Sequence, residues 1–202
     1  MLAGGKTESL SFHGQFRSNI KMKKTSVLTL ALIAIVFASH VQAQDEVMNT
    51  GYGFGFQILQ VQRDFGLGLN ITSPYFGHDK IAVRLRGNLM FNENVQNANT
   101  TWTPYSSMSL GLIGVGGKVG DFIRLYGEGG IIGLKPSNEF STQNFVFGGY
   151  GLFGFEFFMN NSSNYFIEIG GVGTGAKADK IVTKPIYSNG LLISAGFRIH
   201  LK

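Results

Sequence analysis

The sequence contains no cysteine, and this absence excludes several kinds of protein at once. A disulfide framework, a thiolate metal site, a cysteine nucleophile and a lipid-anchored cysteine all need that side chain. Charged residues are also scarce, at 14% of the chain, against roughly 25% in an ordinary soluble domain. Glycine is abundant instead, with 29 residues in 202. This composition argues against an ordinary soluble domain.

The formal net charge of +5 would normally suggest a nucleic-acid partner. Almost all of the excess lies before residue 44, because residues 1–43 hold five basic residues and one acidic residue. The rest of the chain carries twelve basic and eleven acidic residues and is close to neutral. We therefore expect no nucleic-acid partner.

Residues 21–44 read KMKKTSVLTLALIAIVFASHVQAQ and have the three parts of a secretory signal peptide. Three lysines precede an apolar run over 27–37, and a short polar stretch with small residues follows it. The run is too short for a spanning helix, which needs about 20 apolar residues. We expect cleavage between Ala43 and Gln44. The chain then divides into an upstream extension from a mis-called start (1–21), a signal peptide (22–43) and a mature domain (44–202).

The mature chain shows no helical spacing of apolar residues, but period-2 alternation recurs throughout, with turn residues between the runs. The pattern predicts eight strands, over 51–60, 64–75, 80–92, 105–117, 121–134, 144–158, 164–175 and 189–202. Proline has no N–H to donate to a strand ladder. The four prolines lie in or beside the expected connections, at Pro74, Pro104, Pro136 and Pro185.

The connections alternate in length. The short ones are 77–79, 118–120 and 159–163, and the long ones are 93–104, 135–143 and 176–188. Only 61–63 is short where the alternation expects a long loop. Short turns at one end and long loops at the other are typical of outer-membrane barrels.

Seven charged residues lie well inside the expected strands, always on the face opposite to the apolar one. They are Arg84, Arg86, Arg124, Glu128, Glu156, Glu168 and Arg198. A shift of one residue would place charge on the apolar face, so the register is well specified. A soluble barrel would turn these charges outward and would need a surface with roughly 25–35% charged residues. The low charge content favours a membrane barrel, with the apolar face toward lipid.

Aromatic residues gather near the ends of the expected strands, as they do in the girdles at the two membrane interfaces. We expect such girdles to include Tyr52, Tyr75, Trp102, Tyr105, Tyr165 and Tyr187.

These features resemble the small OmpA/OmpX-type outer-membrane β-barrel proteins of diderm bacteria. The resemblance covers 51–202 and includes a last strand with an apolar face, although the strand ends in Lys202 where that family usually has an aromatic residue. It implies an all-β fold, an eight-stranded antiparallel up-and-down transmembrane β-barrel after a cleaved signal peptide, located in the bacterial outer membrane. The implied partners are outer-membrane lipid, lipopolysaccharide and the barrel-assembly machinery, and we expect a monomer.

Four arginines against three glutamates nearly cancel, as buried charges must if pairing is to offset desolvation. We expect this network to close a lumen that is already filled by side chains, as is usual at eight strands. The leading hypothesis is a non-catalytic outer-membrane protein with a structural or surface-binding role, carried by its long loops.

Three alternatives stay open: a small-solute or hydrophobic-ligand channel, a lipid-A-modifying enzyme and a secreted soluble barrel. The enzyme would need a histidine near a serine and a carboxylate. His200 instead has Arg198 and Lys202 as neighbours on its own face of the strand. With His78 the only other histidine of the mature chain and no cysteine, we expect no metal, no cofactor and no catalysis.

Overall fold

The computed structural model of the chain describes residues 51–96, 99–120 and 122–201. The predicted extension (1–21), the signal peptide (22–43) and its cleavage site at Ala43 and Gln44 lie outside the described residues. No helix long and apolar enough to cross a membrane occurs in the described part of the chain.

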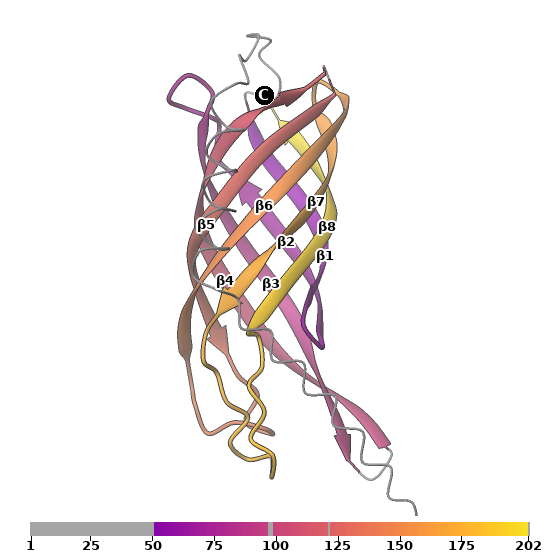
Figure 1. The fold of residues 1–202 in the computed structure, drawn as a ribbon, viewed down its shortest axis with the longest axis vertical. Helices are drawn as coiled ribbons and strands as arrows, with labels where there is room; N and C mark the ends of the chain where they lie inside the picture. Colours follow the sequence, from indigo (N-terminus) through magenta and orange to yellow (C-terminus); the bar gives the residue numbers. More distant parts are fainter. Residues whose placement is uncertain (1–50, 97–98, 121, 202) are drawn as a thin grey trace, which may run out of the picture. The chain divides into compact units, whose positions relative to one another are not determined.

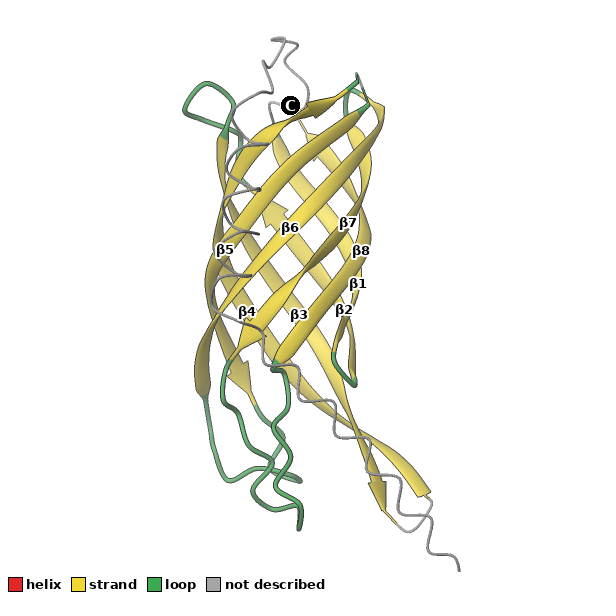
Figure 2. Ribbon diagram, in the orientation of Figure 1, coloured by secondary structure: helices red, strands yellow, loops and turns green. Residues whose placement is uncertain are grey.

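Eight antiparallel strands form one closed barrel in sequence order (Figures 1 and 2). They are β1 (Tyr52–Val61), β2 (Asp64–Thr72), β3 (Ile81–Gln96), β4 (Asn99–Val119), β5 (Ile123–Lys135), β6 (Val146–Asn160), β7 (Ser163–Gly173) and β8 (Gly190–Leu201). Pairing of β1 with β8, from Tyr52–Leu201 to Val61–Leu192, closes the barrel. The predicted all-β fold, an eight-stranded antiparallel up-and-down barrel, is therefore confirmed.

Alternation along each strand separates the two faces of the barrel wall. β1 and β2 alternate strictly between exposed and buried residues. Large apolar side chains such as Phe56, Leu69 and Leu112 point outward and are exposed. Because successive side chains of a strand point to opposite faces, the same pleat turns the polar partners of these residues into the lumen.

The β2–β3, β4–β5 and β6–β7 connections and the two long loops lie at opposite ends of the barrel (Figure 2). The β2–β3, β4–β5 and β6–β7 turns share one end with the start of β1 and the end of β8. The long β5–β6 and β7–β8 loops lie at the other end, together with the two-residue β1–β2 turn and the tip of the β3–β4 hairpin. We call these the turn end and the loop end.

The connection expected as a loop over 93–104 is a two-stranded ribbon instead. β3 and β4 remain paired as far as Gln96 and Asn99 and project beyond the barrel rim (Figure 1). The sequence argument took the polar residues of this segment as a loop signal, but threonine and tryptophan also favour strands. Pro104 therefore lies inside β4, opposite Phe91. The pairing of β4 with β5 ends at Ser106, so the proline occupies an edge position that it tolerates.

The interior has two layers. Toward the loop end, the inward side chains are apolar and include Leu59, Met90, Leu134 and Leu192, with Phe140 of the β5–β6 loop packed against them. Toward the turn end, most inward side chains are polar or charged, although the buried Ala82, Ile113 and Phe166 also lie there. The candidate site lies in this second layer.

Candidate functional site

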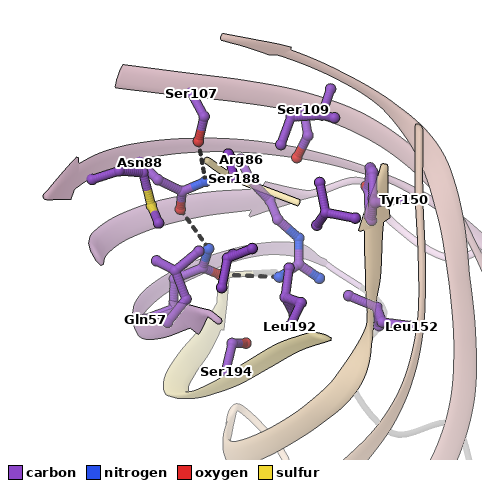
Figure 3. Close-up of a pocket in the computed structure, with 15 residues that line it drawn as sticks. Gln57, Arg86, Asn88, Ser107, Ser109, Tyr150, Leu152, Ser188, Leu192 and Ser194 are labelled. Carbon is purple, nitrogen blue, oxygen red and sulfur yellow. Dashed lines mark hydrogen bonds between the residues drawn. The ribbon is translucent and has the colours of Figure 1, made fainter. Parts of the chain in front are cut away.

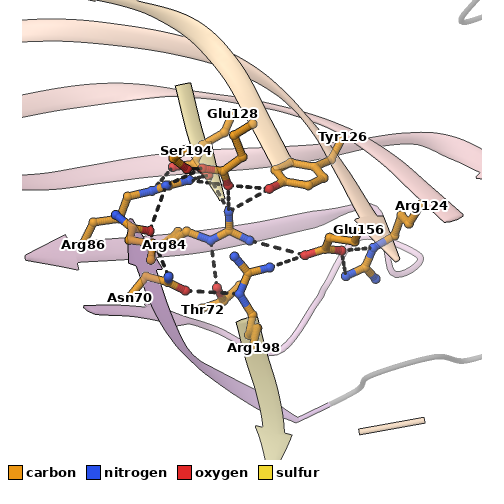
Figure 4. A network of polar contacts seen from close by, with 12 residues as sticks. Asn70, Thr72, Arg84, Arg86, Arg124, Tyr126, Glu128, Glu156, Ser194 and Arg198 are labelled. Atoms are coloured by element: carbon orange, nitrogen blue, oxygen red, sulfur yellow. Dashed lines mark hydrogen bonds and ion pairs between the residues drawn. The ribbon is translucent and has the colours of Figure 1, made fainter. Parts of the chain in front are cut away.

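The structure brings together in the lumen all seven charged residues singled out in the sequence, and Figure 4 labels all of them except Glu168. They come from five strands: Arg84 and Arg86 from β3, Arg124 and Glu128 from β5, Glu156 from β6, Glu168 from β7 and Arg198 from β8. Each paired side chain is at least 95% buried. We refer to these seven residues as the lumen network.

One half of the network pairs two arginines with two glutamates. Arg86 donates to Glu128 from Nε and Nη2, at 3.0 and 2.6 Å, and to Glu168 from Nη1 and Nη2, at 2.7 and 2.9 Å. Nη1 of Arg84 reaches the same two carboxylates, at 2.7 and 3.1 Å. Two positive and two negative charges balance here, so the pairing offsets much of the cost of removing them from water.

The other half is centred on Glu156. Its carboxylate accepts from Nε of Arg124 at 2.7 Å and from Nη1 of Arg198. Nη2 of Arg84 lies 3.7 Å from Glu156 Oε1 and joins the two halves. Three guanidinium groups therefore surround one carboxylate, and the network as a whole carries one more positive charge than negative.

Uncharged polar side chains complete the network. Tyr150 donates to Glu128 at 2.7 Å, Ser194 donates to Glu168 at 2.6 Å, and Tyr126 also donates to Glu168. Gln57 and Asn70, on β1 and β2, join the arginines. Gln57 Oε1 accepts from Arg86 at 3.2 Å, and Asn70 Oδ1 accepts from Arg198 at 3.1 Å.

The sequence argument missed Gln57 and Asn70. Both are uncharged, and a search limited to charged residues in strands passes over them. The signal was present nonetheless, because each is a polar residue on the face of its strand opposite to the large apolar side chains.

A small cavity of about 20 Å³ separates the network from the apolar layer (Figure 3). Arg86, Gln57 and Asn88 line its polar side, while Leu152 and Leu192 belong to its apolar side. A cavity of this size holds roughly one water molecule, and a drug-sized ligand needs several hundred Å³.

Three aromatic rings cap the loop end of the interior. Tyr105, Phe140 and Tyr187 pack edge to face, with ring centroids 4.9–6.0 Å apart. Beneath them lies the buried carboxylate of Asp64, which accepts from Tyr105 Oη at 2.6 Å and from the Ser188 backbone N–H at 2.9 Å. Asp64 thus ties β2 to β4 and to the β7–β8 loop. The sequence argument did not identify it, because an aspartate beside a turn has an ordinary local explanation.

The two long loops are also bonded to each other. The Asp179 carboxylate accepts from the backbone N–H of Thr142 at 2.8 Å and from its hydroxyl. The backbone N–H of Lys180 donates to Phe140 O at 3.1 Å. The hydrogen bonds from Thr142 lower the pKa of Asp179 below its ordinary value of 3.8, because they stabilise the charged form.

Half of the predicted aromatic girdle is wrong. Tyr52, Trp102 and Tyr165 lie on the outer face and are more than half exposed. Tyr105 and Tyr187 are instead buried in the aromatic cap. Tyr75 turns back over the lumen, where its hydroxyl accepts from Arg124 Nη2 at 3.0 Å and its ring lies 4.3 Å from that guanidinium. Nearness to a strand end does not say which way a side chain points.

His200 is buried at the turn end, on the same inward face as Arg198. Neither ring nitrogen has a hydrogen-bond partner among the described residues. The described ranges also contain no group of three or more histidine, aspartate or glutamate side chains that could hold a metal ion.

The chain forms a closed eight-stranded barrel that is apolar outside and ion-paired inside. This is the fold of the small outer-membrane β-barrels. No family model and no curated protein matches the sequence. Among solved structures, the chain is similar to the N-terminal β-barrel domain of OprF from Pseudomonas aeruginosa. Identity is 12%, coverage is 76% of this chain and 98% of that one, and the TM-score is 0.53.

The outer membrane protein OprG, also from Pseudomonas aeruginosa, matches at 16% identity over 80% of this chain and 100% of its own, with a TM-score of 0.50. Ail, the attachment invasion locus protein of Yersinia pestis, matches at 12% identity over 73% and 95%, with a TM-score of 0.34. The OprF and OprG matches establish the fold and confirm the resemblance to OmpA/OmpX-type barrels at that level.

Proposed function

We propose that the protein is a non-catalytic bacterial outer-membrane barrel, with a lumen closed by the lumen network and a structural or surface-binding role carried by its loop end. One observation carries this proposal. Seven charged side chains from five strands pair with one another across the lumen, with side chains at least 95% buried.

The outer face supports a location in a membrane. Large apolar side chains such as Phe54, Leu112 and Ile167 are about half exposed around the barrel. Monomeric soluble proteins rarely expose apolar patches larger than a few hundred Å², whereas a bilayer buries such a surface. By the rule that outer-membrane barrels have short periplasmic turns and longer external loops, the loop end faces the cell exterior.

Closure is supported from both sides of the small cavity. The network spans the lumen on one side, and the cap of Tyr105, Phe140 and Tyr187 covers the other. A solute that crosses the lumen would have to displace these buried ion pairs. Breaking one buried pair costs roughly 3–5 kcal/mol.

The loop end supports a role in surface contacts. The β7–β8 loop carries Lys177, Lys180 and Lys184, and Val182 in the same loop is almost fully exposed. A basic rim of this kind suits the anionic groups of lipopolysaccharide. We propose lipopolysaccharide, outer-membrane lipid and the barrel-assembly machinery as partners of a monomeric barrel.

Four measurements test the proposal. Folded protein extracted in detergent should migrate faster on a gel before heating than after, and it should give no steady conductance in a planar bilayer. Steady conductance would contradict closure and favour the small-solute channel. Full solubility without detergent would contradict membrane insertion. A change in lipid A mass spectra that depends on His200, tested with His200→Ala, would favour the enzyme.

A further inference from the structure

Two hollows adjoin on the outer wall of β1–β5. The first, of about 630 Å³, lies at the loop end, between the β1–β2 turn and the base of the ribbon. It is lined by Gln60, Gln62, Arg63, Phe65, Phe91, Glu93 and Trp102. The lining combines three aromatic rings, two amides and both signs of charge, a composition suited to a polar ring-shaped group at a membrane interface.

The second hollow, of about 670 Å³, is almost entirely apolar. Its lining includes Phe56, Leu67, Leu69, Leu89 and Met108. Gly87 forms part of its floor, where a side-chain carbon would meet nothing within 4 Å. The missing side chain leaves a groove between neighbouring leucines.

Strand register fixes the order of the two hollows. Phe65 pairs with Phe91 in the first, and Leu67 pairs with Leu89 in the second. These pairs are two residues apart along the same strands, or roughly 7 Å. The polar and aromatic hollow is the one nearer the loop end, so the wall offers a headgroup site directly above an acyl-chain site.

Two cations flank this surface at the loop end. Arg63 lies in the β1–β2 turn and lines the first hollow, while Lys135 ends β5 and lines the rim of the second. With Glu93, they give the surface one net positive charge. Arginine and lysine at two separate points suit a ligand with more than one phosphate.

We propose that this wall binds one molecule of a phosphorylated glycolipid of the lipid A type. Its sugar ring stacks on the aromatic side chains beside the two glutamine amides. Its phosphates meet Arg63 and Lys135, and its acyl chains fill the groove over Gly87. The proposal rests on the proposed outer-membrane location, because only there does such a lipid reach the loop end of the barrel wall.

Native mass spectrometry of the full barrel in detergent tests the proposal, with purified lipid A added and phosphatidylglycerol as the competing anionic lipid. The double variant Arg63→Gln/Lys135→Gln should lower lipid A occupancy about tenfold. Gly87→Leu fills the groove without changing charge and should lower occupancy as well. Lys80→Gln is the matched control, because this exposed lysine lies in the β2–β3 turn at the opposite end.

Each outcome decides between the two proposals. Equal lipid A occupancy in all variants, or equal binding of phosphatidylglycerol, would overturn the glycolipid site and leave the outer-membrane proposal intact. If the unmodified protein shows no heat-dependent gel shift, the membrane proposal itself is overturned. If the double variant fails to fold, Gly87→Leu still decides, because occupancy unchanged by a filled groove contradicts the site.

Discussion

Arg86 and Glu128 meet through two parallel hydrogen bonds, Nε to Oε1 at 3.0 Å and Nη2 to Oε2 at 2.6 Å. Such a fork needs the planar guanidinium group, and lysine cannot reproduce it. The same guanidinium also reaches Glu168 through two bonds. One side chain of β3 therefore bridges two buried carboxylates from two different strands.

Arg86→Met should destabilise the barrel by roughly 3–5 kcal/mol, because it leaves two buried carboxylates with only Arg84 as a shared partner. Urea unfolding in lipid vesicles, followed by the gel shift of the folded form, measures the loss. The second-site change Glu168→Gln should restore part of it by removing one unpaired charge. Lys80→Met, in an exposed turn, should have little effect. A cost for Arg86→Met below about 1 kcal/mol would contradict a structural role for the pair.

Strand alternation was enough to predict the inward direction of the network. The residues on either side of Arg84 and of Glu168 are apolar and face lipid, so the charged side chain between them must face the lumen. The same alternation turns all seven charged side chains of the network inward. Eight strands joined by connections of alternating length further predict that the sheet closes into a barrel. The barrel and the membership of the network were therefore accessible before any coordinates.

The loop end was not accessible in the same way. Strand alternation ends where the strands end, so it could not tell that Tyr187 of the β7–β8 loop folds back over the interior. Tyr105 shares the inward face of β4 with Ser107 and Ser109, but the prediction placed it by its nearness to a strand end instead. Asp64 has a partner 124 residues away along the chain, at Ser188. No local pattern encodes that contact. The ribbon around Trp102 was missed because polar strand residues resemble a loop when neither face is buried.

Asp64→Ala should loosen the β7–β8 loop, because Tyr105 Oη and the Ser188 N–H lose their common acceptor in a buried site. An unsatisfied buried group costs about 1–3 kcal/mol. Limited proteolysis of intact protein in detergent should then cut within 174–189 at a higher rate. Glu139→Ala is the control, since this exposed carboxylate lies in the neighbouring loop. Equal cleavage rates in both variants would show that Asp64 does not hold the loop.

Gly154→Ala should destabilise the barrel by about 1–3 kcal/mol through overpacking. Gly154 is paired with Tyr126, and a side-chain carbon there would overlap the tyrosine ring, which is held by its hydrogen bond to Glu168. Gly114→Ala is a matched change, because a carbon there meets nothing within 4 Å. Its effect should stay within about 0.5 kcal/mol. Urea midpoints of the two variants give the comparison, and equal midpoints would contradict the packing argument.

Docking of the β5–β6 loop on the β7–β8 loop should depend on acid pH through Asp179. Its bonded form is the carboxylate, and its pKa is lowered by the two bonds from Thr142. A carboxyl group whose pKa is lower in the folded state than in the unfolded state stabilises the folded state fully at any pH above its unfolded pKa. That contribution is lost as the pH falls through the folded-state pKa. The bonds should therefore persist above the ordinary value of 3.8 and break below it.

The Thr142 amide signal in the NMR spectrum of micelle-bound protein reports this directly, because its N–H donates to Asp179. The signal should move with a midpoint below 3.8. Asp179→Asn keeps an acceptor oxygen but cannot titrate, so in that variant the signal should stay fixed. Movement of the Thr142 signal with a midpoint at or above 3.8 in the unmodified protein would contradict the bond, as would an identical movement in Asp179→Asn.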